Sequence, residues 1–569
     1  MEKKSPVYTL YNECQDCYKC VRRCPVKAIR IQNGHAGVLP ERCIACGRCV
    51  APCPSHAKQV RNDVAKVKEL LRSNKKVYVS LAPSWRAAFD CNSSIMIAVL
   101  KKLGFTGVSE TALGAQAVSI QTAKILNEAQ SGFFISSACP VIVDYVRLYK
   151  SEMTPYITQL ASPALTHARI LQDTFGSDIG VVFIGPCIGK KNESDRHPDL
   201  IDVALTFEEL KVWLKDEDIR FDDVMIDETH TFLPERSFEG ALYPIDGGMN
   251  ETIRKVGVKP TVQLINICSL DLFKNALAKL DVKSLKYPIF IEALACDGGC
   301  MNGPCVASVR SDFANISKVM GHTKQRKEIP LMPQAVVEMK YEPNPVSSKV
   351  YPLDEIRNAL RRIGKYLPQD ELNCAGCGYQ TCQEMAKALL DGDAEPSMCV
   401  SYMRQIATRK VAAMLKSMPS AMVMLDANLN ILEANEAFIK FFAGSMKDIF
   451  LSSPERLVGL PVKGMLDWTP LFKMVLKTGK EIHKEHYKFN KKCYDVHLFP
   501  IEDGLSIGAI ITDITGVQNS KELVAQKAKE VINKNISIVQ EIACLLGEHM
   551  VETETLLSAI ADDYNEAEE

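Results

Sequence analysis

The chain has 569 residues, of which 47% are hydrophobic and 24% charged, as in ordinary soluble proteins of roughly three to five domains. A net charge of -1 gives no reason to expect nucleic acid or a membrane surface as a partner. No apolar run reaches the ~18–20 residues of a membrane span. The first residues lack the apolar core of a secretory signal, so we expect a cytoplasmic protein.

The 21 cysteines are clustered, which in a reducing compartment indicates metal or cluster ligands rather than disulfides. The segments CQDCYKCVRRCP (14–25) and CIACGRCVAPCP (43–54) repeat the pattern C-x2-C-x2-C-x3-C-P. Three thiolates of such a loop hold one cubane, and the fourth cysteine reaches the partner cluster, whereas paired zinc knuckles do not end in C-x3-C-P. The expected ligand sets are Cys14, Cys17, Cys20 and Cys53 for one 4Fe-4S cluster, and Cys43, Cys46, Cys49 and Cys24 for the other. Residues 5–62 thus resemble a bacterial two-cluster ferredoxin.

The region that follows has a different sequence pattern. Apolar runs rich in β-forming residues end in loops of small residues, and most of these loops carry a cysteine. The runs are KVYVSLAPSW, GFFISSACP, IGVVFIGPC and YPIFIEALAC, with helical patterns such as TALGAQAVSIQTAKILNEA between them. Strand, loop and helix in alternation predict an α/β region with largely parallel sheets, whose site lies at the carboxyl ends of the strands. The loop cysteines are Cys139, Cys187, Cys296 and Cys300.

A third cysteine group follows an irregular, proline-bearing linker and a short helix. Its cysteines, three on one loop and one further on, are Cys374, Cys377, Cys382 and Cys399. They fit a 4Fe-4S site, and zinc remains an alternative because this spacing is less diagnostic. Residues 366–404 resemble a small iron–sulfur domain found beside other redox modules, which favours a cluster.

Residues 414–517 predict two short strands and a helix, then three alternating strands with turns at Asn490 and at Asp503–Gly504. This order of elements resembles a PAS domain, a fold that senses or pairs and seldom catalyses. A haem could use the side chains of His483, His486, His497 and Cys493, although core or surface roles are the commoner ones for such residues.

The tail, residues 518–562, predicts a helix because it contains no turn signals from 519 to 546. Apolar residues recur every seven positions, with one polar residue in the seam, as in a parallel dimeric coiled coil. The seam residues are Val524, Val531, Ile538 and Leu545, alternating with Ala528, Asn535 and Ile542. A single amphipathic helix that packs on the preceding domain is an equal alternative.

The central cysteine loops read together as a set: SSACP with Cys139, GPCIGKKNE with Cys187 and Lys190, and EALACDGGCMNGPC with Cys296 and Cys300. Residues 75–346 resemble the catalytic domain of FeFe hydrogenases, whose loops read TSCCP, MPCxxKxxE and ExMACxxGCxxG. With the flanking modules, the architecture is similar to that of the sensory FeFe hydrogenases. The predicted class is therefore a multidomain protein of mixed α/β and α+β parts.

The resemblance implies an H-cluster, in which Cys139, Cys187, Cys296 and Cys300 hold a 4Fe-4S cubane. Cys300 would bridge to a two-iron subsite that carries CO, cyanide and a dithiolate amine. Lys190 matches the lysine that donates to one cyanide, and Glu193 matches the glutamate that ends the loop pattern. The turn Ala82-Pro83-Ser84 matches the segment that donates to the other cyanide. Two ferredoxin-type 4Fe-4S clusters and one further 4Fe-4S cluster complete the expected cofactors.

The loops also depart from the family pattern. Ala138 stands where the family has a second cysteine, which passes protons from the metals toward solvent, and alanine has no group to donate or accept a proton. Gly185 and Leu294 replace methionines that contact the two-iron subsite. Cys305 could be another proton relay, but a small buried residue is the plainer interpretation.

Three functions follow. The first is a low-activity, regulatory hydrogenase that reacts slowly with H2 and relays redox state through its clusters to a PAS domain. This homodimer would signal to a separate kinase or phosphatase, because the sequence shows no such domain of its own. The second is a catalytic hydrogenase that exchanges electrons with ferredoxin, and the third is an iron–sulfur protein without the two-iron subsite. In each, no nucleic acid or membrane is expected as a partner.

Overall fold

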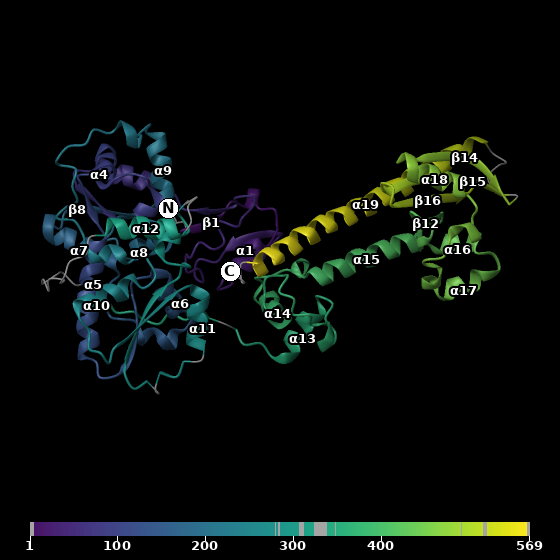
Figure 1. Ribbon diagram of the computed structural model, residues 1–569. Coiled ribbons are helices and arrows are strands. Elements are labelled where there is room, and N and C mark those ends of the chain that lie inside the picture. Colours follow the sequence, from purple (N-terminus) through teal and green to yellow (C-terminus); the bar gives the residue numbers. More distant parts are fainter. Residues whose placement is uncertain are drawn as a thin grey trace. The chain divides into compact units, whose positions relative to one another are not determined.

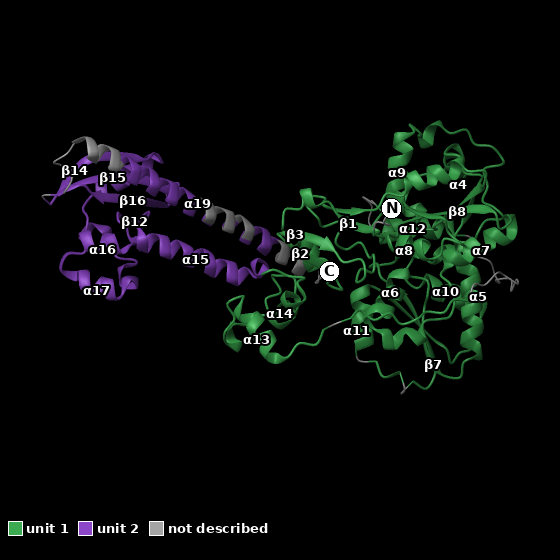
Figure 2. Ribbon diagram, turned by 180° about the vertical axis from the view of Figure 1, so that it is seen from behind, with its two compact units in different colours: residues 1–395 green, residues 396–569 purple. Residues whose placement is uncertain are grey.

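The computed structural model describes residues 5–278, 280–282, 285–306, 312–323, 338–347, 349–490, 492–515 and 521–565. It divides into two compact units, residues 1–395 and 396–569, which are coloured separately in Figure 2. No helix among the described residues is long and apolar enough to cross a membrane. None of the described cysteines is in a disulfide.

The N-terminal part of the first unit is built from two similar halves. Strand β1 (Val7–Thr9) pairs antiparallel with β4 (Lys58–Val60), and β2 (Ile29–Gln32) pairs antiparallel with β3 (His35–Val38). The short helix α1 (Lys19–Arg23) joins the first cysteine loop to β2. Each cysteine loop bends through residues of positive φ, because a chain that wraps three thiols around one centre must turn sharply; these residues are Asp16, Tyr18, Ala45 and Gly47.

A four-stranded parallel sheet follows, with the strand order β6-β5-β8-β9. Its strand β8 is labelled in Figure 1. Its strands are β5 (Lys76–Leu81), β6 (Gly107–Glu110), β8 (Ile179–Gly185) and β9 (Val203–Thr206). Every residue of β8 is buried, as expected of a parallel strand with helices on both faces. The helices that pack against this sheet include α2 (Val64–Arg72), α4 (Ser93–Lys102), α7 (Pro163–Phe175) and α9 (Phe207–Asp216).

A second parallel sheet has the order β10-β11-β7. Its strands are β7 (Gly132–Ile135), β10 (Gln263–Cys268) and β11 (Pro288–Leu294), and its neighbours include α5 (Ala112–Glu128), α6 (Pro140–Tyr149), α10 (Gly248–Val256) and α11 (Leu270–Ala278). The sequence prediction of parallel strands separated by helices is confirmed in both sheets. Strands β7, β8 and β11 all end directly before a cysteine loop, so their carboxyl ends define where the site forms.

The last part of the first unit is a small helical region. Helix α13 (Leu353–Arg361) packs against α14 (Cys382–Asp391), and the loop between them carries Cys374 and Cys377. The chain after α14 returns to the N-terminal part, where the backbone N–H of Ile31 donates to the carbonyl of Asp393 at 2.9 Å. This region is therefore docked on the two-cluster part.

The second unit begins with α15 (Val400–Ser417) and contains a five-stranded antiparallel sheet of order β13-β12-β16-β15-β14. The strands are β12 (Ala421–Asp426), β13 (Ile431–Ala434), β14 (Ile482–Phe489), β15 (Lys492–Glu502) and β16 (Ser506–Asp513), with helices α16 (Glu436–Phe442), α17 (Lys447–Ser452) and α18 (Thr469–Thr478) inserted between β13 and β14. The two strands, helix and three strands predicted from the sequence are confirmed. One face of the sheet packs on an aromatic core that includes Phe438, Phe442, Trp468, Phe472 and Tyr494.

The opposite face of that sheet is covered in part by the 45-residue helix α19 (Lys521–Asn565). Asn535 and Ile542 are buried, and the Asn535 amide donates to Ser420 Oγ at 3.1 Å. A cavity of about 720 Å³ separates the helix from sheet residues such as Phe499 and Ile510. Two residues of the predicted coiled-coil seam are thus buried against their own chain, as the packed-helix alternative expects. The side chains of Val524, Ala528 and Leu545, and the predicted boundary at residues 517 and 518, lie outside the described residues.

Candidate metal centre

Four buried or half-buried cysteines from three loops meet at the carboxyl ends of β7, β8 and β11. Burial, together with the nearby Cys139 thiol, raises the pKa of Cys187 to about 12. Burial also raises the pKa of Cys300, whose neighbours include Cys139 and Cys187. It likewise raises that of Cys296, whose neighbours include the other three cysteines of the site. The structure therefore brings together the four cysteines that the sequence singled out.

The chemistry of this donor set fits an iron–sulfur cluster. Thiols this deeply buried stay protonated at neutral pH unless a metal displaces the proton. Cys139 is the N-cap of α6, and the N–H groups of Val141 and Ile142 act against the burial that raises its pKa. Backbone N–H groups aimed at a thiolate are donors of the kind that tune cluster sulfurs.

Lys190 lies in helix α8 (Gly189–Arg196), three positions after Cys187. Its side chain is buried rather than solvated, and its ammonium donates to Glu193 Oε2 at 2.6 Å and to Ser162 Oγ at 2.9 Å. The Ser162 hydroxyl also donates to Glu193 Oε2 at 2.9 Å. Lys190 is close enough to lower the pKa of Cys139 and Cys300, so its charge faces the thiols. Two of its three N–H donors are engaged by Ser162 and Glu193.

The turn Ala82-Pro83-Ser84 directly follows β5, and its Ala82 and Ser84 are buried. The Ala82 N–H donates to the carbonyl of Ile184 at 2.9 Å, so this turn lies beside the end of β8 and the Cys187 loop. Gly185 fits there because a Cβ would lie 2.6 Å from the Phe183 ring and 2.9 Å from Ala82 Cβ. A bulky side chain is thus excluded at Gly185 by the packing of this chain.

Ala138 is half-buried and packs with the cluster that contains Leu160 and Phe290. Its N–H donates to Ser136 Oγ at 3.2 Å, and its methyl group offers no proton. Cys305 is buried and desolvation raises its pKa to about 12, which agrees with the plainer interpretation of a small buried residue.

Sequence reasoning assigned no role to Glu292, although it begins the EALAC loop. Its carboxyl group is 1% exposed, and burial raises its pKa to about 7. Oε2 accepts from the Asn250 N–H at 2.8 Å, and Oε1 has no hydrogen-bond partner among the described residues. Glu292 is among the groups that raise the pKa of Cys300. Its position four residues before Cys296 was the available signal, but the sequence alone does not reveal its burial.

The ferredoxin-like cysteines fall into two groups in the structure. Burial raises the pKa of Cys20 to about 11, and the thiols that act on it are those of Cys17, Cys14 and Cys53. Burial likewise raises the pKa of Cys49, whose neighbouring thiols are Cys46, Cys43 and Cys24. These are the two sets that the cross-paired repeat predicts.

The remaining predicted ligands are divided between the two units. Cys374, Cys377 and Cys382 belong to the first unit, where the Cys382 N–H donates to Asn373 Oδ1 at 2.8 Å. Cys399 belongs to the second unit, as the N-cap of α15. Among the described residues, no three His, Cys, Asp or Glu side chains are placed to hold a single metal ion.

Two of the three histidines considered for a haem have acidic partners. His483 Nε2 lies 2.9 Å from Asp495 Oδ1, and His497 Nε2 lies 3.1 Å from Glu481 Oε2. His486 is exposed, whereas Cys493 is buried. This arrangement does not favour the haem.

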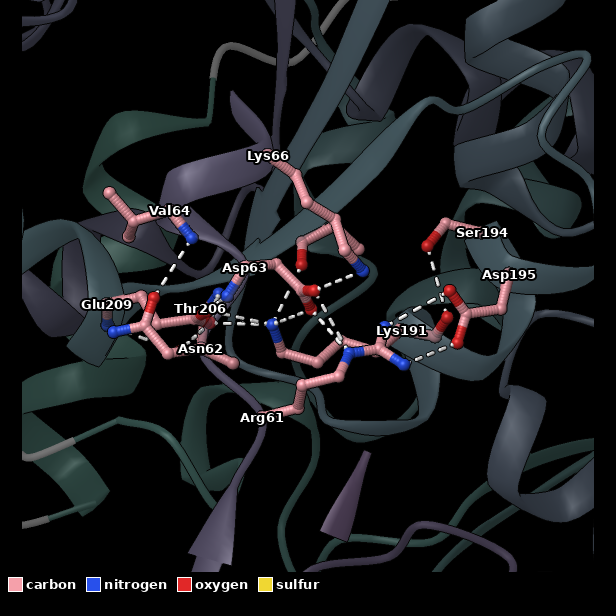
Figure 3. A network of polar contacts seen from close by, with 11 residues as sticks. Arg61, Asn62, Asp63, Val64, Lys66, Lys191, Ser194, Asp195, Thr206 and Glu209 are labelled. Carbon is pink, nitrogen blue, oxygen red and sulfur yellow. Dashed lines mark hydrogen bonds and ion pairs between the residues drawn. The ribbon is translucent and has the colours of Figure 1, made fainter. Parts of the chain in front are cut away.

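A charged network that the sequence did not reveal holds α8 in place (Figure 3). Lys191 is fully buried, and its ammonium binds Asp63 at 2.9 Å, Glu209 at 2.8 Å and the carbonyl of Ala204 at 3.0 Å. Arg61 binds Asp63 and, through both terminal nitrogens, Asp195. Burial would raise the pKa of Asp63, but Lys191, Lys66 and Arg61 lower it overall.

Comparison with known proteins agrees with this arrangement. Residues 75–304 match the family model "Iron only hydrogenase large subunit, C-terminal domain", and residues 6–54 match a "4Fe-4S dicluster domain". Residues 367–401 match a model for an Fe-S cluster domain. Residues 75–304 are therefore similar to the hydrogenase domain of iron-only hydrogenases, and residues 6–54 are similar to a 4Fe-4S ferredoxin-like domain.

Individual relatives cover part of the chain. Iron hydrogenase 1 of Clostridium pasteurianum is 27% identical over 300 residues, which are 42% of this chain and 51% of that protein. The chain thus spans about half the length of this curated relative. A variant of [FeFe]-hydrogenase HydA1 from Chlamydomonas reinhardtii is 18% identical, with a TM-score of 0.37, over 50% of this chain and 100% of that one. The PAS domain of histidine kinase ThkA is 17% identical, with a TM-score of 0.13, over 16% of this chain and 98% of that one.

Proposed function

We propose that this protein is a sensory FeFe hydrogenase, which reacts slowly and reversibly with H2 and passes its redox state to a signalling domain. The observation that carries the proposal is Ala138, whose methyl group offers no proton-transfer group beside four buried or half-buried thiols and a buried lysine. The reaction with H2, the partners and the regulatory role are all part of the proposal.

In this proposal Cys139, Cys187, Cys296 and Cys300 would hold the iron–sulfur part of the H-cluster, and Cys300 would also serve the two-iron subsite. When bound, the H-cluster supplies the metal centre at which H2 is split or formed. The thiols are suited to this because they are buried, close to one another and faced by the Lys190 ammonium. Cyanide is a strong acceptor, so the Lys190 N–H not engaged by Ser162 and Glu193 can form a charge-assisted bond to it. The turn Ala82-Pro83-Ser84 is proposed to donate to the second cyanide.

Ala138 makes proton movement the slow step in this proposal. Proton transfer by a side chain requires a titratable group within hydrogen-bond reach, and contributes roughly 10²–10⁴-fold to rate. The Ala138 methyl group cannot supply this, so we expect protons to leave by a poorer path.

The signalling part is proposed to be a PAS domain at residues 414–517. Support comes from the element order β12, β13, helices, β14, β15, β16 and from the strand order with β12 and β16 adjacent at the centre. Helix α19 lies against this sheet and is proposed to carry the output of a homodimer to a separate kinase or phosphatase. The cysteines of the accessory loops are proposed to hold two ferredoxin-type 4Fe-4S clusters and one more 4Fe-4S cluster.

The test compares H2 turnover and infrared spectra of wild type, Ala138→Cys and Ala138→Val, each matured with the two-iron subsite. We expect intact CO and cyanide bands in all three, slow wild-type turnover and a gain of at least about tenfold in Ala138→Cys alone, because only cysteine restores a titratable group. Ala138→Val is the matched control for side-chain volume. Fast wild-type turnover with no gain in the cysteine variant would contradict the sensory proposal.

Two alternatives each have an observation in their favour. Glu292, a buried carboxyl group whose pKa is about 7, could move protons near Cys300, which favours a catalytic hydrogenase working with ferredoxin. Lys190 has partners in Glu193 and Ser162 without any cyanide, which favours an iron–sulfur protein that lacks the two-iron subsite. High turnover in the first experiment supports the former, and absent CO and cyanide bands support the latter.

A further inference from the structure

The small helical region is fastened to the two-cluster part by a buried carboxylate. Asp393, whose side chain is 4% exposed, accepts from Arg30 Nε at 2.8 Å and from Arg42 Nη1 at 2.6 Å. Arg30 lies on β2, and Arg42 directly precedes Cys43. The Asn33 N–H adds a bond to Glu395 Oε1 at 2.6 Å. A buried carboxylate that holds two guanidinium groups is a specific contact, since removing one member leaves the others unpaired.

This contact brings two cysteine loops together. Gly378 follows Cys377 and has a φ of +93°, and a Cβ at that position would lie 3.0 Å from Val21 Cγ1 and 3.1 Å from Arg22 N. Val21 and Arg22 lie between Cys20 and Cys24, within α1. The loop that carries Cys377 thus rests directly on the helical turn that leads into Cys24.

A cation lies beside both loops. The Lys27 ammonium donates to the carbonyl of Val21 at 3.2 Å. Burial lowers the pKa of Lys27, and the thiols of Cys24 and Cys377 are both near enough to act in the opposite direction. The same two thiols are among the groups that act on the buried Tyr379. Two independent side chains therefore place Cys24 and Cys377 in one neighbourhood.

The opposite side of the same cysteine set contacts the hydrogenase domain. A Cβ at Gly47, which follows Cys46, would lie 2.7 Å from Ile188 Cδ1 and 2.7 Å from Pro304 Cβ. Cys46 is among the thiols that act on Cys296, and Lys274 Nζ donates to the carbonyl of Pro25 at 3.0 Å. The loops of Cys24 and Cys46 are thus in contact with two different cysteine groups.

We propose that the cysteine set Cys24, Cys43, Cys46 and Cys49 is a branch point for electrons, and that the Asp393–Arg30–Arg42 contact fastens the Cys377 loop onto it. One branch leads to the cubane cysteines through Gly47, and the other leads to the small domain through Gly378. Each transfer moves one electron from one 4Fe-4S cluster to the next, without forming or breaking a bond. The electrons come from H2 under the proposed function, on which this inference rests, or from a chemical reductant.

Lys27 has a defined role in this branch. A positive charge between two clusters stabilises the more negative, reduced state of both. Lys27→Met should therefore shift the midpoint potentials of the clusters on Cys24 and on Cys377 to lower values. The cluster expected on Cys14, Cys17, Cys20 and Cys53 should move less, because Lys27 is not among the strongest influences on the Cys20 thiol.

The first experiment uses the full chain, reconstituted with iron and sulfide and reduced with dithionite. Electron paramagnetic resonance identifies the Cys377 cluster as the signal that Cys377→Ala loses. We expect this signal to be broadened by spin coupling in wild type and in the control Glu355→Gln, which changes an exposed carboxylate of α13. In Asp393→Asn the coupling should weaken at unchanged iron content, because the buried charge that holds the contact is lost. Absence of coupling in wild type, or full coupling in Asp393→Asn, overturns the proposal.

A second arm separates this inference from the proposed function. Under H2, rapid freezing should show slower reduction of the Cys377 cluster in Asp393→Asn than in wild type, with the other clusters reduced at the same rate. Equal rates overturn the branch. If H2 reduces no cluster at all, the proposed function fails, and the dithionite coupling still decides the inference.

Should Asp393→Asn lose iron, the midpoint potentials of Lys27→Met decide the inference. A shift of both clusters supports the proposal, and a shift of one or neither overturns it.

Discussion

Single residues show most clearly what the sequence can and cannot predict. The cysteines were found by spacing, because consecutive ligands of a cluster loop are neighbours in the chain. Three buried charged residues could not be found in this way, because their partners are distant in the sequence. Glu292 is 42 positions from Asn250, Lys191 is 128 from Asp63, and Asp393 is 363 from Arg30. Burial of a charged side chain depends on such distant partners, and no local pattern records them.

Glu292 gives a prediction at this scale. A carboxyl group whose pKa rises from 4.5 to about 7 on folding destabilises the folded state once the unfolded state ionises. The destabilisation is absent below the pKa of 4.5 that the carboxyl group has in the unfolded chain. It grows as the pH rises toward the folded pKa of about 7, and above that pH it stays constant. We expect wild type to lose on the order of 3 kcal/mol over this range, and Glu292→Gln to lose much less.

Thermal unfolding at pH 5 and pH 8 measures this difference. The control is Glu338→Gln, which changes an exposed carboxylate of the same predicted domain. The control should keep the wild-type difference between the two pH values. A Glu292→Gln profile as steep as that of wild type would mean that the carboxyl group is not held neutral by its surroundings.

At the scale of elements, α8 is the segment that connects the most parts of the site. It follows Cys187, carries Lys190, and is tied to α6 by Arg196, whose guanidinium binds the carboxylate of Asp144. Its inner side is fixed by the Lys191 network with Asp63 and Glu209. Because Asp63 comes from the segment between the ferredoxin-like part and β5, the network couples that segment to the cluster loop.

Lys191→Met should therefore destabilise the fold strongly. The substitution removes the cation from two buried carboxylates, a change that typically costs 3–5 kcal/mol. The matched control is Lys211→Met, which breaks a half-exposed pair with Glu208 and should cost about 0–1 kcal/mol. Denaturant unfolding of the two variants measures the difference. Similar midpoints would contradict the view that Lys191 holds the network together.

At the scale of the whole molecule, the order of parts was predictable and the contacts between elements were not. Each cysteine group predicted a cysteine loop, and each alternating apolar pattern predicted a strand. The helix α19 was ambiguous, because the same apolar periodicity serves a coiled coil and a helix packed on a sheet. In the structure Val539 packs with Leu415, Met418 and Met422, so α19 contacts both α15 and the start of β12.

A polar group of buried residues connects these elements of the second unit. The Asn435 amide donates to the carbonyl of Ser420 at 2.8 Å and to that of Leu415 at 3.3 Å, and Asn435 Oδ1 accepts from the Met422 N–H at 2.9 Å. Asn535 of α19 joins this group through Ser420 Oγ. The group links the end of α15, the start of β12 and the middle of α19.

Asn535→Leu tests whether this contact or a coiled coil uses that face of α19. We expect the variant to loosen the helix, because Ser420 loses its buried partner, and to raise amide hydrogen exchange in α19 severalfold without changing the oligomeric state. Asn533→Leu is the matched control, since Asn533 is exposed two positions away on the same helix. In a coiled coil, an apolar residue in place of a seam asparagine strengthens association and relaxes the choice of oligomer. Sedimentation that shows tighter or larger assemblies for Asn535→Leu alone would therefore place Asn535 at an interface between copies rather than against its own domain.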